Sequence, residues 1–145
     1  MIELREMTKD DIEGVLEIER ECFSTPWSLE AFKMELKNDI ALYVVARYEE
    51  KVVGYGGLWN ILNEGHITNI AVSEGFRDKG IGSKILSELI EICKKKSACS
   101  MTLEVRSNNE AAKHLYKKYG FEEAGVRPKY YADNNEDAII MWLTF

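Results

Sequence analysis

Residues Phe76 to Ser83 read FRDKGIGS and join two apolar segments whose patterns differ. The preceding segment, His66 to Val72, is apolar and β-branched, which favours a strand. The following segment repeats apolar residues at helical spacing from Ile81 to Cys93, which predicts a helix. A glycine turn between a strand and a helix is typical of anion sites, because the first amides of a helix lack intrahelical partners. Gly80 and Gly82 would let a phosphate approach a backbone without side chains.

Motif spacing distinguishes several kinds of phosphate site. A P-loop needs G-x-x-x-x-G-K-[ST], but Ile81 and Gly82 follow Gly80, so the ATPase interpretation fails. A dinucleotide fingerprint needs G-x-G-x-x-G, and Ile85 stands where its third glycine belongs, which leaves that interpretation weak. A glycine-rich turn without a ligand is the remaining alternative.

The length and composition suit one globular domain, residues 1–145, since domains commonly hold about 100 to 150 residues. The longest apolar run is far shorter than the roughly 20 residues that span a bilayer, and the charged N-terminus is unlike a signal peptide. We therefore expect a cytoplasmic protein that does not bind membranes. Three cysteines without a C-x-x-C pair suit a reducing compartment and predict no metal site. The net charge of −6 argues against binding nucleic acid.

Periodicity, caps and turn residues predict the remaining elements. The expected strands cover residues 1–7, 41–48, 51–62, 65–72, 101–105, 122–131 and 137–145. The expected helices cover residues 8–22, 28–36, 80–96 and 109–119. Thr8 and Ser28 are the predicted N-caps of the first two helices, and Leu29, Phe32 and Leu36 should face inward. The order β-α-α-β-β-β-α-β-α-β-β predicts an α/β fold with one mixed sheet and helices on both sides.

Arg77, Gly80 and Gly82 fit the pattern R/Q-x-x-G-x-G/A, which resembles the pyrophosphate-binding signature of the GNAT N-acetyltransferases. The element order is similar to the GNAT core, with the glycine segment between the fourth strand and the third helix. Further segments narrow the resemblance to the RimI-like ribosomal-protein alanine N-acetyltransferases over nearly the whole chain. These segments are CFSTPWS (22–28), NIAV (69–72), LEVRSNN (103–109), LYKKYGF (115–121), RPKYY (127–131) and EDAIIM (136–141). The departures are Asn108, where the family has Ser, and Phe76, where Gln is common.

The resemblance implies acetyl-CoA as the acyl donor. The strand before the glycine segment would splay from its neighbour and offer backbone groups to the pantetheine arm and the thioester carbonyl. The glycine segment would bind the pyrophosphate through amides, with Arg77 and Lys79 adding charge. Asn109 would bind the coenzyme arm, although a role as N-cap alone is the alternative. The expected cofactor-binding residues are Ile70, Ala71, Val72, Arg77, Asp78, Lys79, Gly80, Ile81, Gly82, Ser83, Asn109 and Tyr116.

Acetyl transfer to an amine needs a base for the amine, hydrogen-bond donors for the oxyanion and a proton for the leaving thiolate. Glu104 is the candidate base, because it is the only acid in its strand and alternation places it opposite the face of Leu103 and Val105. A solvent-facing strand residue is the alternative. The resemblance makes Tyr116 the acid for the coenzyme A thiolate, with core packing as the alternative.

The resemblance also implies an acceptor groove with Trp27, Tyr130, Tyr131 and Glu136, although the paired tyrosines equally suit a half-buried strand. Its expected occupant is a protein N-terminus, namely the N-terminal alanine of small-subunit ribosomal protein number eighteen, acetylated directly in a ternary complex by a monomer or weak dimer. The alternatives are an acetyltransferase for lysine side chains or small amines, and a non-enzymatic acyl-CoA-binding module.

Overall fold

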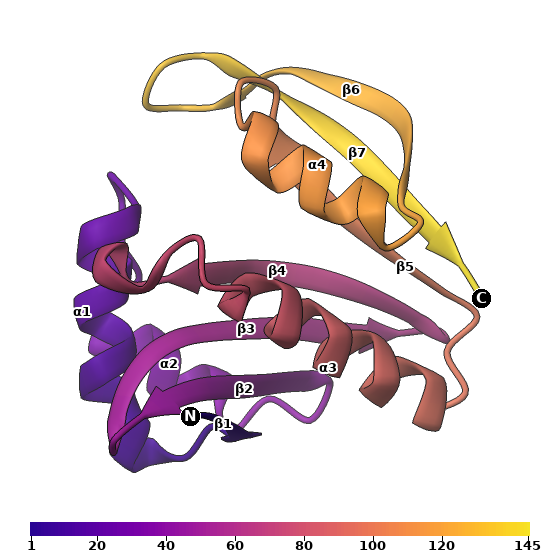
Figure 1. Cartoon of the computed structure of the whole chain (residues 1–145). Helices are drawn as coiled ribbons and strands as arrows, with labels where there is room; N and C mark the ends of the chain where they lie inside the picture. Colours follow the sequence, from indigo (N-terminus) through magenta and orange to yellow (C-terminus); the bar gives the residue numbers. More distant parts are fainter.

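One seven-stranded sheet runs through the computed structural model, which describes residues 1–145 (Figure 1). The strands are β1 (Ile2–Glu6), β2 (Ala41–Tyr48), β3 (Lys51–Ile61), β4 (Glu64–Val72), β5 (Ser100–Arg106), β6 (Glu122–Tyr131) and β7 (Glu136–Thr144). The helices are α1 (Ile12–Cys22), α2 (Leu29–Glu35), α3 (Ile81–Lys95) and α4 (Glu110–Lys118), with short 3-10 helices at Lys9–Asp11 and Glu74–Phe76. This order confirms the predicted α/β fold. None of the helices has the length and apolar character that crossing a bilayer requires.

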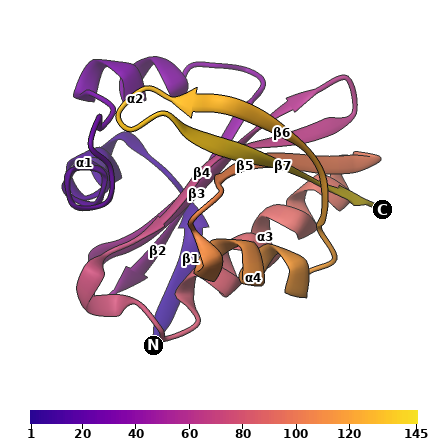
Figure 2. The ribbon, with the colours of Figure 1, turned by 90° about the horizontal axis from the view of Figure 1, so that it is seen from above.

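The helices cover both faces of the sheet, as predicted. Figure 2 shows α1 and α2 on one side of the strands and α3 and α4 on the other. The core under α3 contains Ile85 and Leu89, and the core under α1 contains Val15, Phe32 and Tyr55, all of them 0% exposed. Apolar burial contributes about 25 cal/mol per Å² of surface, so these two cores hold the helices against the sheet.

Two-residue turns connect the central strands. Glu49 and Glu50, between β2 and β3, have φ of 49° and 69°, and the hairpin predicted at this position is confirmed. Leu62 and Asn63, between β3 and β4, have φ of 49° and 67°. Two successive left-handed residues give a turn whose twist matches the twist of the flanking strands. The resulting hairpins place β2, β3 and β4 side by side in antiparallel order.

Two details of the predicted helices differ from the structure. Thr8 is an N-cap, as predicted, but the turn that follows it is a 3-10 helix, and α1 begins only at Ile12. The reason is that the Asp11 carboxylate turns back to accept the Thr8 backbone N–H at 2.9 Å, which closes a tight first turn. Leu29 is 36% exposed instead of facing inward, because the seven-residue α2 buries only Phe32 and its first residue lies beyond the core.

The sheet opens between β4 and β5, which diverge in Figure 1. The two strands pair in parallel only from Glu64 with Ser100 to His66 with Thr102, whereas β5 pairs with β7 along its whole length, from Ser100 with Thr144 to Arg106 with Ala138. A bulge lies just past the last pair, because Leu58 of β3 pairs with Ile67 and Gly57 pairs with Asn69, which leaves Thr68 as the extra residue. Bulges bend the strand that carries the extra residue, so this one helps to direct β4 away from β5.

The close approach of β2 and β3 makes a testable prediction at Gly57. A Cβ atom there would lie 2.1 Å from Cε1 of the buried Tyr43 ring. We expect Gly57→Ala to lower the free energy of unfolding by at least about 1–3 kcal/mol, because an overpacked core forces side chains and backbone to shift. Urea denaturation measures this change. Gly75→Ala is the control, since no atom lies within 4 Å of its added Cβ; equal losses in the two variants would contradict the packing argument.

Candidate active site

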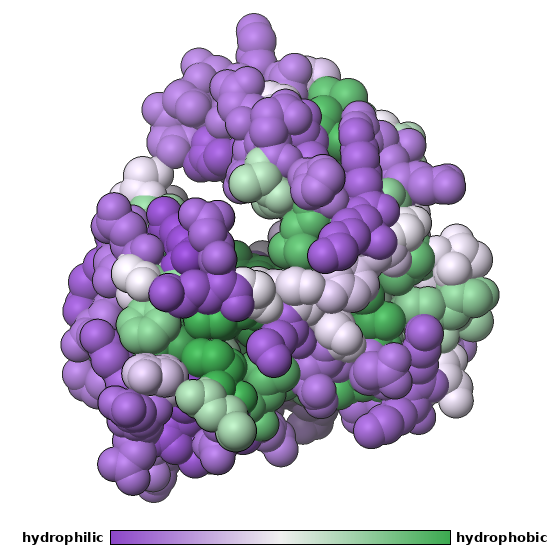
Figure 3. Space-filling model, viewed as in Figure 1, coloured by the Kyte–Doolittle hydropathy of each residue, from purple (hydrophilic) through white to green (hydrophobic).

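A wedge-shaped opening forms where β4 and β5 separate. Past the pair of His66 with Thr102, the edge of β4 that faces β5 has no strand partner, and this edge includes Ile70, Ala71 and Val72. The space-filling view shows the surface hollowed in this region, between the part that carries α4 and the part that carries α3 (Figure 3). The strand that was predicted to splay and expose backbone groups therefore does so.

The N-terminus of α3 borders the same opening. Gly80 is the N-cap with φ of 79°, and Asp78 is also left-handed with φ of 61°. The first helical hydrogen bond runs from the Lys84 N–H to the Gly80 carbonyl at 3.1 Å. The amides of residues 81–83 therefore have no helical acceptor and lie at the positive end of the helix dipole. This is the anion-site geometry that the glycine spacing predicted.

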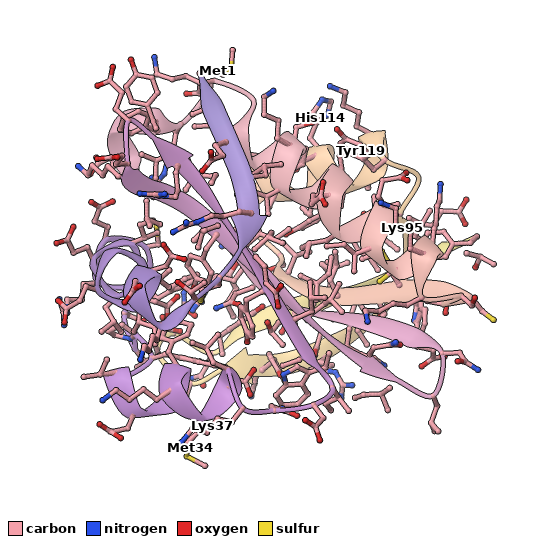
Figure 4. The ribbon with its side chains drawn as sticks, turned by 90° about the horizontal axis from the view of Figure 1, so that it is seen from below. Met1, Met34, Lys37, Lys95, His114 and Tyr119 are labelled. Carbon is pink, nitrogen blue, oxygen red and sulfur yellow. The ribbon has the colours of Figure 1, made fainter.

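Two side chains of the glycine segment have partners within the protein. The Arg77 guanidinium donates to the Val72 carbonyl at 3.2 Å and contacts Cys22 Sγ at 3.2 Å, so it closes the end of β4. The Ser83 hydroxyl bonds the hydroxyl of Tyr119, at the end of α4, and Tyr119 also donates to the Ser83 carbonyl at 3.3 Å (Figure 4). Arg77 is thus engaged at β4, and Ser83 has only its amide free for a ligand.

Glu104 lies on β5 with its carboxylate bonded to the Arg127 guanidinium at 2.6 Å. Leu103 and Val105 are buried in the core under α3, so the predicted alternation of β5 is confirmed and Glu104 faces the side of α1. About a third of its side chain, 32%, is exposed. Arg127 also lies over the Tyr130 ring, with its central carbon 5.9 Å from the ring centroid. No role was predicted for Arg127, because its partner lies two strands away across β7.

The pKa values of two predicted site tyrosines are raised. Burial raises the pKa of Tyr116 to about 12, and Tyr131 adds a smaller effect in the same direction. Burial also raises the pKa of Tyr131 to about 12, with Arg106, whose guanidinium stacks 4.0 Å from the ring centroid, opposing it and Glu104 adding to it. Tyr116 belongs to the core under α3, and Tyr131 lies at the end of β6. Both phenols keep their protons at neutral pH.

The loop between α1 and α2 lies near the turn between β6 and β7. The Trp27 backbone N–H donates to the Glu19 carboxylate at 2.9 Å, and the Trp27 ring packs on Phe32 with centroids 5.2 Å apart. The Ser24 hydroxyl donates to Asp133 at 2.8 Å, which joins this loop to the turn between β6 and β7. Tyr130, on β6, is 50% exposed. Trp27 thus comes from this loop, and the two tyrosines come from the end of β6, next to the turn that the contact joins to the loop.

Glu136, which the resemblance assigned to the acceptor groove, is bonded to the loop between β5 and α4. Its carboxylate accepts the Asn108 backbone N–H at 2.7 Å and the Ser107 hydroxyl at 3.3 Å, and it pairs with Arg106 at 3.3 Å. The bond from the Asn108 amide is the main cause that lowers the pKa of Glu136. Asn109 follows as the N-cap of α4, accepting the Ala112 N–H at 3.1 Å. The Glu136 carboxylate therefore holds the loop that leads from β5 into α4.

A set of polar side chains that the sequence did not reveal lies beside β4. They come from five different elements, so no spacing in the sequence connects them. Hydrogen bonds join, in order, Glu19, Tyr55, Asn69, Thr68, Tyr43, Glu35 and Trp59. Glu19 is 1% exposed and forms no ion pair.

The lowered pKa of Glu136 predicts a pH-dependent contribution to stability. A carboxylate with a depressed folded-state pKa stabilises the fold above its unfolded value, here 4.5, and loses that contribution as the pH falls through the folded value. We expect the difference in free energy of unfolding between the wild type and Glu136→Gln to be largest near neutral pH and to shrink on acidification below 4.5. Urea denaturation at several pH values measures it. Glu122→Gln, at an exposed position of β6, is the control; a difference for Glu136→Gln that stays constant with pH would contradict the assignment.

Comparisons with known proteins agree with this geometry. Residues 12–121 match the Acetyltransferase (GNAT) family. The chain is 41% identical over 142 residues to a putative [ribosomal protein bS18]-alanine N-acetyltransferase of Bacillus subtilis, which covers 97% of this chain and 94% of the relative. It is 33% identical over 135 residues to the [ribosomal protein bS18]-alanine N-acetyltransferase of Escherichia coli K12, with coverages of 92% and 90%. The crystal structure of the ribosomal-protein-S18-alanine N-acetyltransferase from Escherichia coli has a TM-score of 0.91, with 32% identity over 99% of this chain and 94% of that one. The chain belongs to the GNAT family and is an acetyl-CoA-dependent N-acetyltransferase.

Proposed function

We propose that this protein transfers the acetyl group of acetyl-CoA to the N-terminal alanine of ribosomal protein bS18. The observation that carries the proposal is the wedge, where the unpaired edge of β4 and the free amides of α3 lie across the opening from β5, the strand that carries Glu104. The names of the Bacillus and Escherichia relatives support bS18 as the acceptor. Because the proposed acceptor is a ribosomal protein, the proposed compartment is the cytoplasm.

The residues around the wedge fit acetyl-CoA in two respects. The amides of residues 81–83 suit the pyrophosphate, because they donate hydrogen bonds at the positive end of α3. The free edge of β4 from Ile70 to the Val72 N–H suits the amide groups of the pantetheine arm, because an unpaired strand edge offers N–H and C=O groups; the Val72 carbonyl is already bonded to Arg77. Lys79 and Asn109 lie in the loops next to these two surfaces. When bound, acetyl-CoA supplies the acetyl group as a thioester.

We assign the proton transfers to Glu104 and Tyr116. Glu104 accepts the proton that the acceptor amine loses, and the ammonium form of that amine competes with Arg127 for the same carboxylate. Tyr116 donates a proton to the leaving sulfur, because its pKa of about 12 keeps the hydroxyl protonated at neutral pH. An unpaired N–H of β4 donates to the thioester carbonyl oxygen, where negative charge develops.

The acceptor is tested with synthetic peptides. We expect acetyl-CoA and the purified protein to acetylate the α-amine of a peptide with the bS18 N-terminus beginning with Ala. A peptide beginning with Met and an N-terminally blocked peptide with internal Lys should react much more slowly. Mass spectrometry locates the acetyl group. Acetylation confined to lysine would contradict the N-terminal assignment, and thermal stabilisation by acetyl-CoA without any turnover would instead support a binding module.

The two proton-transfer residues make a separate prediction. Glu104→Gln and Tyr116→Phe should each lower kcat by about 10²-fold or more, because positioned acids and bases contribute on that scale. The dissociation constant for acetyl-CoA, measured by calorimetry, should stay within a few-fold of the wild-type value. Glu122→Gln, on the exposed face of β6, is the matched control and should keep the wild-type rate. Full rates in both variants would show that the chemistry is wrongly assigned.

A further inference from the structure

The hydrogen-bonded series of polar side chains beside β4 has a glutamate near each end. Glu19 of α1 accepts the hydroxyl proton of Tyr55, and Glu35 of α2 accepts the hydroxyl of Tyr43 at 2.7 Å. Neither carboxylate has a Lys, Arg or His partner. Burial, reinforced by these glutamates, raises the pKa of both tyrosines well above the usual range. Each tyrosine therefore stays protonated and donates a hydrogen bond to its glutamate.

Glu19 and Glu35 determine which group donates and which accepts in each hydrogen bond between them. Because the Tyr55 O–H donates to Glu19, the Tyr55 oxygen accepts a hydrogen bond from the Asn69 side-chain NH₂ group at 2.7 Å. That orientation turns the Asn69 carbonyl oxygen toward Thr68, whose hydroxyl donates to it at 3.0 Å. From the other side, the Tyr43 oxygen lies 3.2 Å from the Thr68 oxygen, and the Tyr43 O–H already donates to Glu35.

Among these hydrogen-bonded side chains, the Thr68 hydroxyl is therefore the group that faces more acceptors than it has protons to donate. It has one proton and faces two acceptors, the Asn69 carbonyl and the Tyr43 oxygen. No side-chain donor of the chain reaches its lone pairs, because the protons of Tyr43 and Tyr55 are committed to glutamates. A group that brings additional N–H donors fits here, and a positively charged one fits better, since both nearby carboxylates lack a cation.

Thr68 lies across the opening from Glu104, the candidate base. His66 and Thr102 form the last pair between β4 and β5, and Thr68 and Glu104 each lie two residues further along. Both side chains are on the α1 side of the sheet, since Thr68 bonds Tyr43 of that core and Glu104 is opposite Leu103 of the other core. At about 3.3 Å per residue, both lie roughly 7 Å beyond the last pair, on opposite sides of the opening. Thr68 is partly exposed there.

We propose that the Thr68 hydroxyl and the Glu104 carboxylate together bind the primary amine of the acceptor, from opposite sides of the wedge. Thr68 accepts one N–H of the amine, and Glu104 accepts the N–H whose proton it removes. Glu19 and Glu35 are positioning residues, because they keep the Thr68 oxygen available as an acceptor through Tyr55, Asn69 and Tyr43. This site rests on the proposed acetylation of an amine, and it does not depend on which protein supplies that amine.

Thr68→Val tests the site, because it removes the hydroxyl and keeps the shape of the side chain. We expect KM for the Ala peptide to rise about tenfold or more, the scale of one hydrogen bond to a charged group. The dissociation constant for acetyl-CoA should stay within twofold, since Thr68 faces the acceptor side. Thr68→Ser should restore KM, because it keeps the hydroxyl and lacks only the methyl group. An unchanged KM in Thr68→Val, or an equal weakening of acetyl-CoA binding, would overturn the proposal.

Glu19→Gln tests the polarity of the chain without changing Thr68. The Gln side-chain oxygen can still accept the Trp27 N–H, while its NH₂ group donates to Tyr55 and reverses the bonds up to Thr68. The Thr68 oxygen then receives an N–H from Asn69, so KM for the amine should again rise several-fold. Glu17→Gln, on the exposed face of the same helix, is the control. A wild-type KM in Glu19→Gln would refute the role of the chain.

The same measurements separate this proposal from the proposed acceptor. If the wild type acetylates only lysine peptides, the N-terminal assignment fails, but the comparison of Thr68→Val with Thr68→Ser on a lysine peptide still tests the amine site. If Thr68→Val does not fold, Thr68→Ala takes its place, with thermal unfolding as the check on folding. Loss of stability without a change in KM would make Thr68 a purely structural residue and overturn the site.

Discussion

β4 and β5 share pairs only from Glu64 with Ser100 to His66 with Thr102, and every part of the candidate site depends on the separation that follows. A parallel pair that continued to Val72 would satisfy the β4 backbone and leave no room for a ligand. Unpaired backbone groups cost about 1–3 kcal/mol each when they are buried, so a fold tolerates such an edge where solvent or a ligand reaches it. The bulge at Thr68 and the pairing of β5 with β7 maintain the separation from the two sides.

Two carboxylates on the acceptor side of the sheet differ in their surroundings. Glu104 is partly exposed and has a cation, Arg127, at 2.6 Å, which an incoming ammonium can replace. Glu19 is 1% exposed and is held only by neutral donors, the Trp27 amide and the Tyr55 hydroxyl. An exchangeable charge partner suits a group that takes up and releases protons. Fixed neutral donors suit a group that orients its neighbours.

The sequence predicted the features that depend on residues close along the chain. The strand, glycine turn and helix around Gly80 follow from periodicity and from the one residue type that adopts φ of 79° without strain. The side-chain partners of Arg77 and Glu136 did not follow, because the Val72 carbonyl and the Asn108 amide come near them only through the tertiary fold. The inward position predicted for Leu29 failed for a related reason, since helical spacing alone does not tell how far a core extends.

Glu19 connects the loop between α1 and α2 to the bulge of β4 through hydrogen bonds. Its burial explains why a carboxylate is suited to the position. One oxygen accepts the Trp27 amide of the loop on the acceptor side, and the other accepts Tyr55, which is linked through Asn69 to the bulge of β4. An apolar residue there would leave the Trp27 N–H and the Tyr55 hydroxyl buried without acceptors, at a cost of about 1–3 kcal/mol for each. An amide would satisfy both groups but reverse the direction of donation toward Thr68. A carboxylate, which accepts with both of its oxygens, holds the Trp27 loop and the Tyr55 hydroxyl together. It also leaves the Thr68 oxygen without a donor from Asn69.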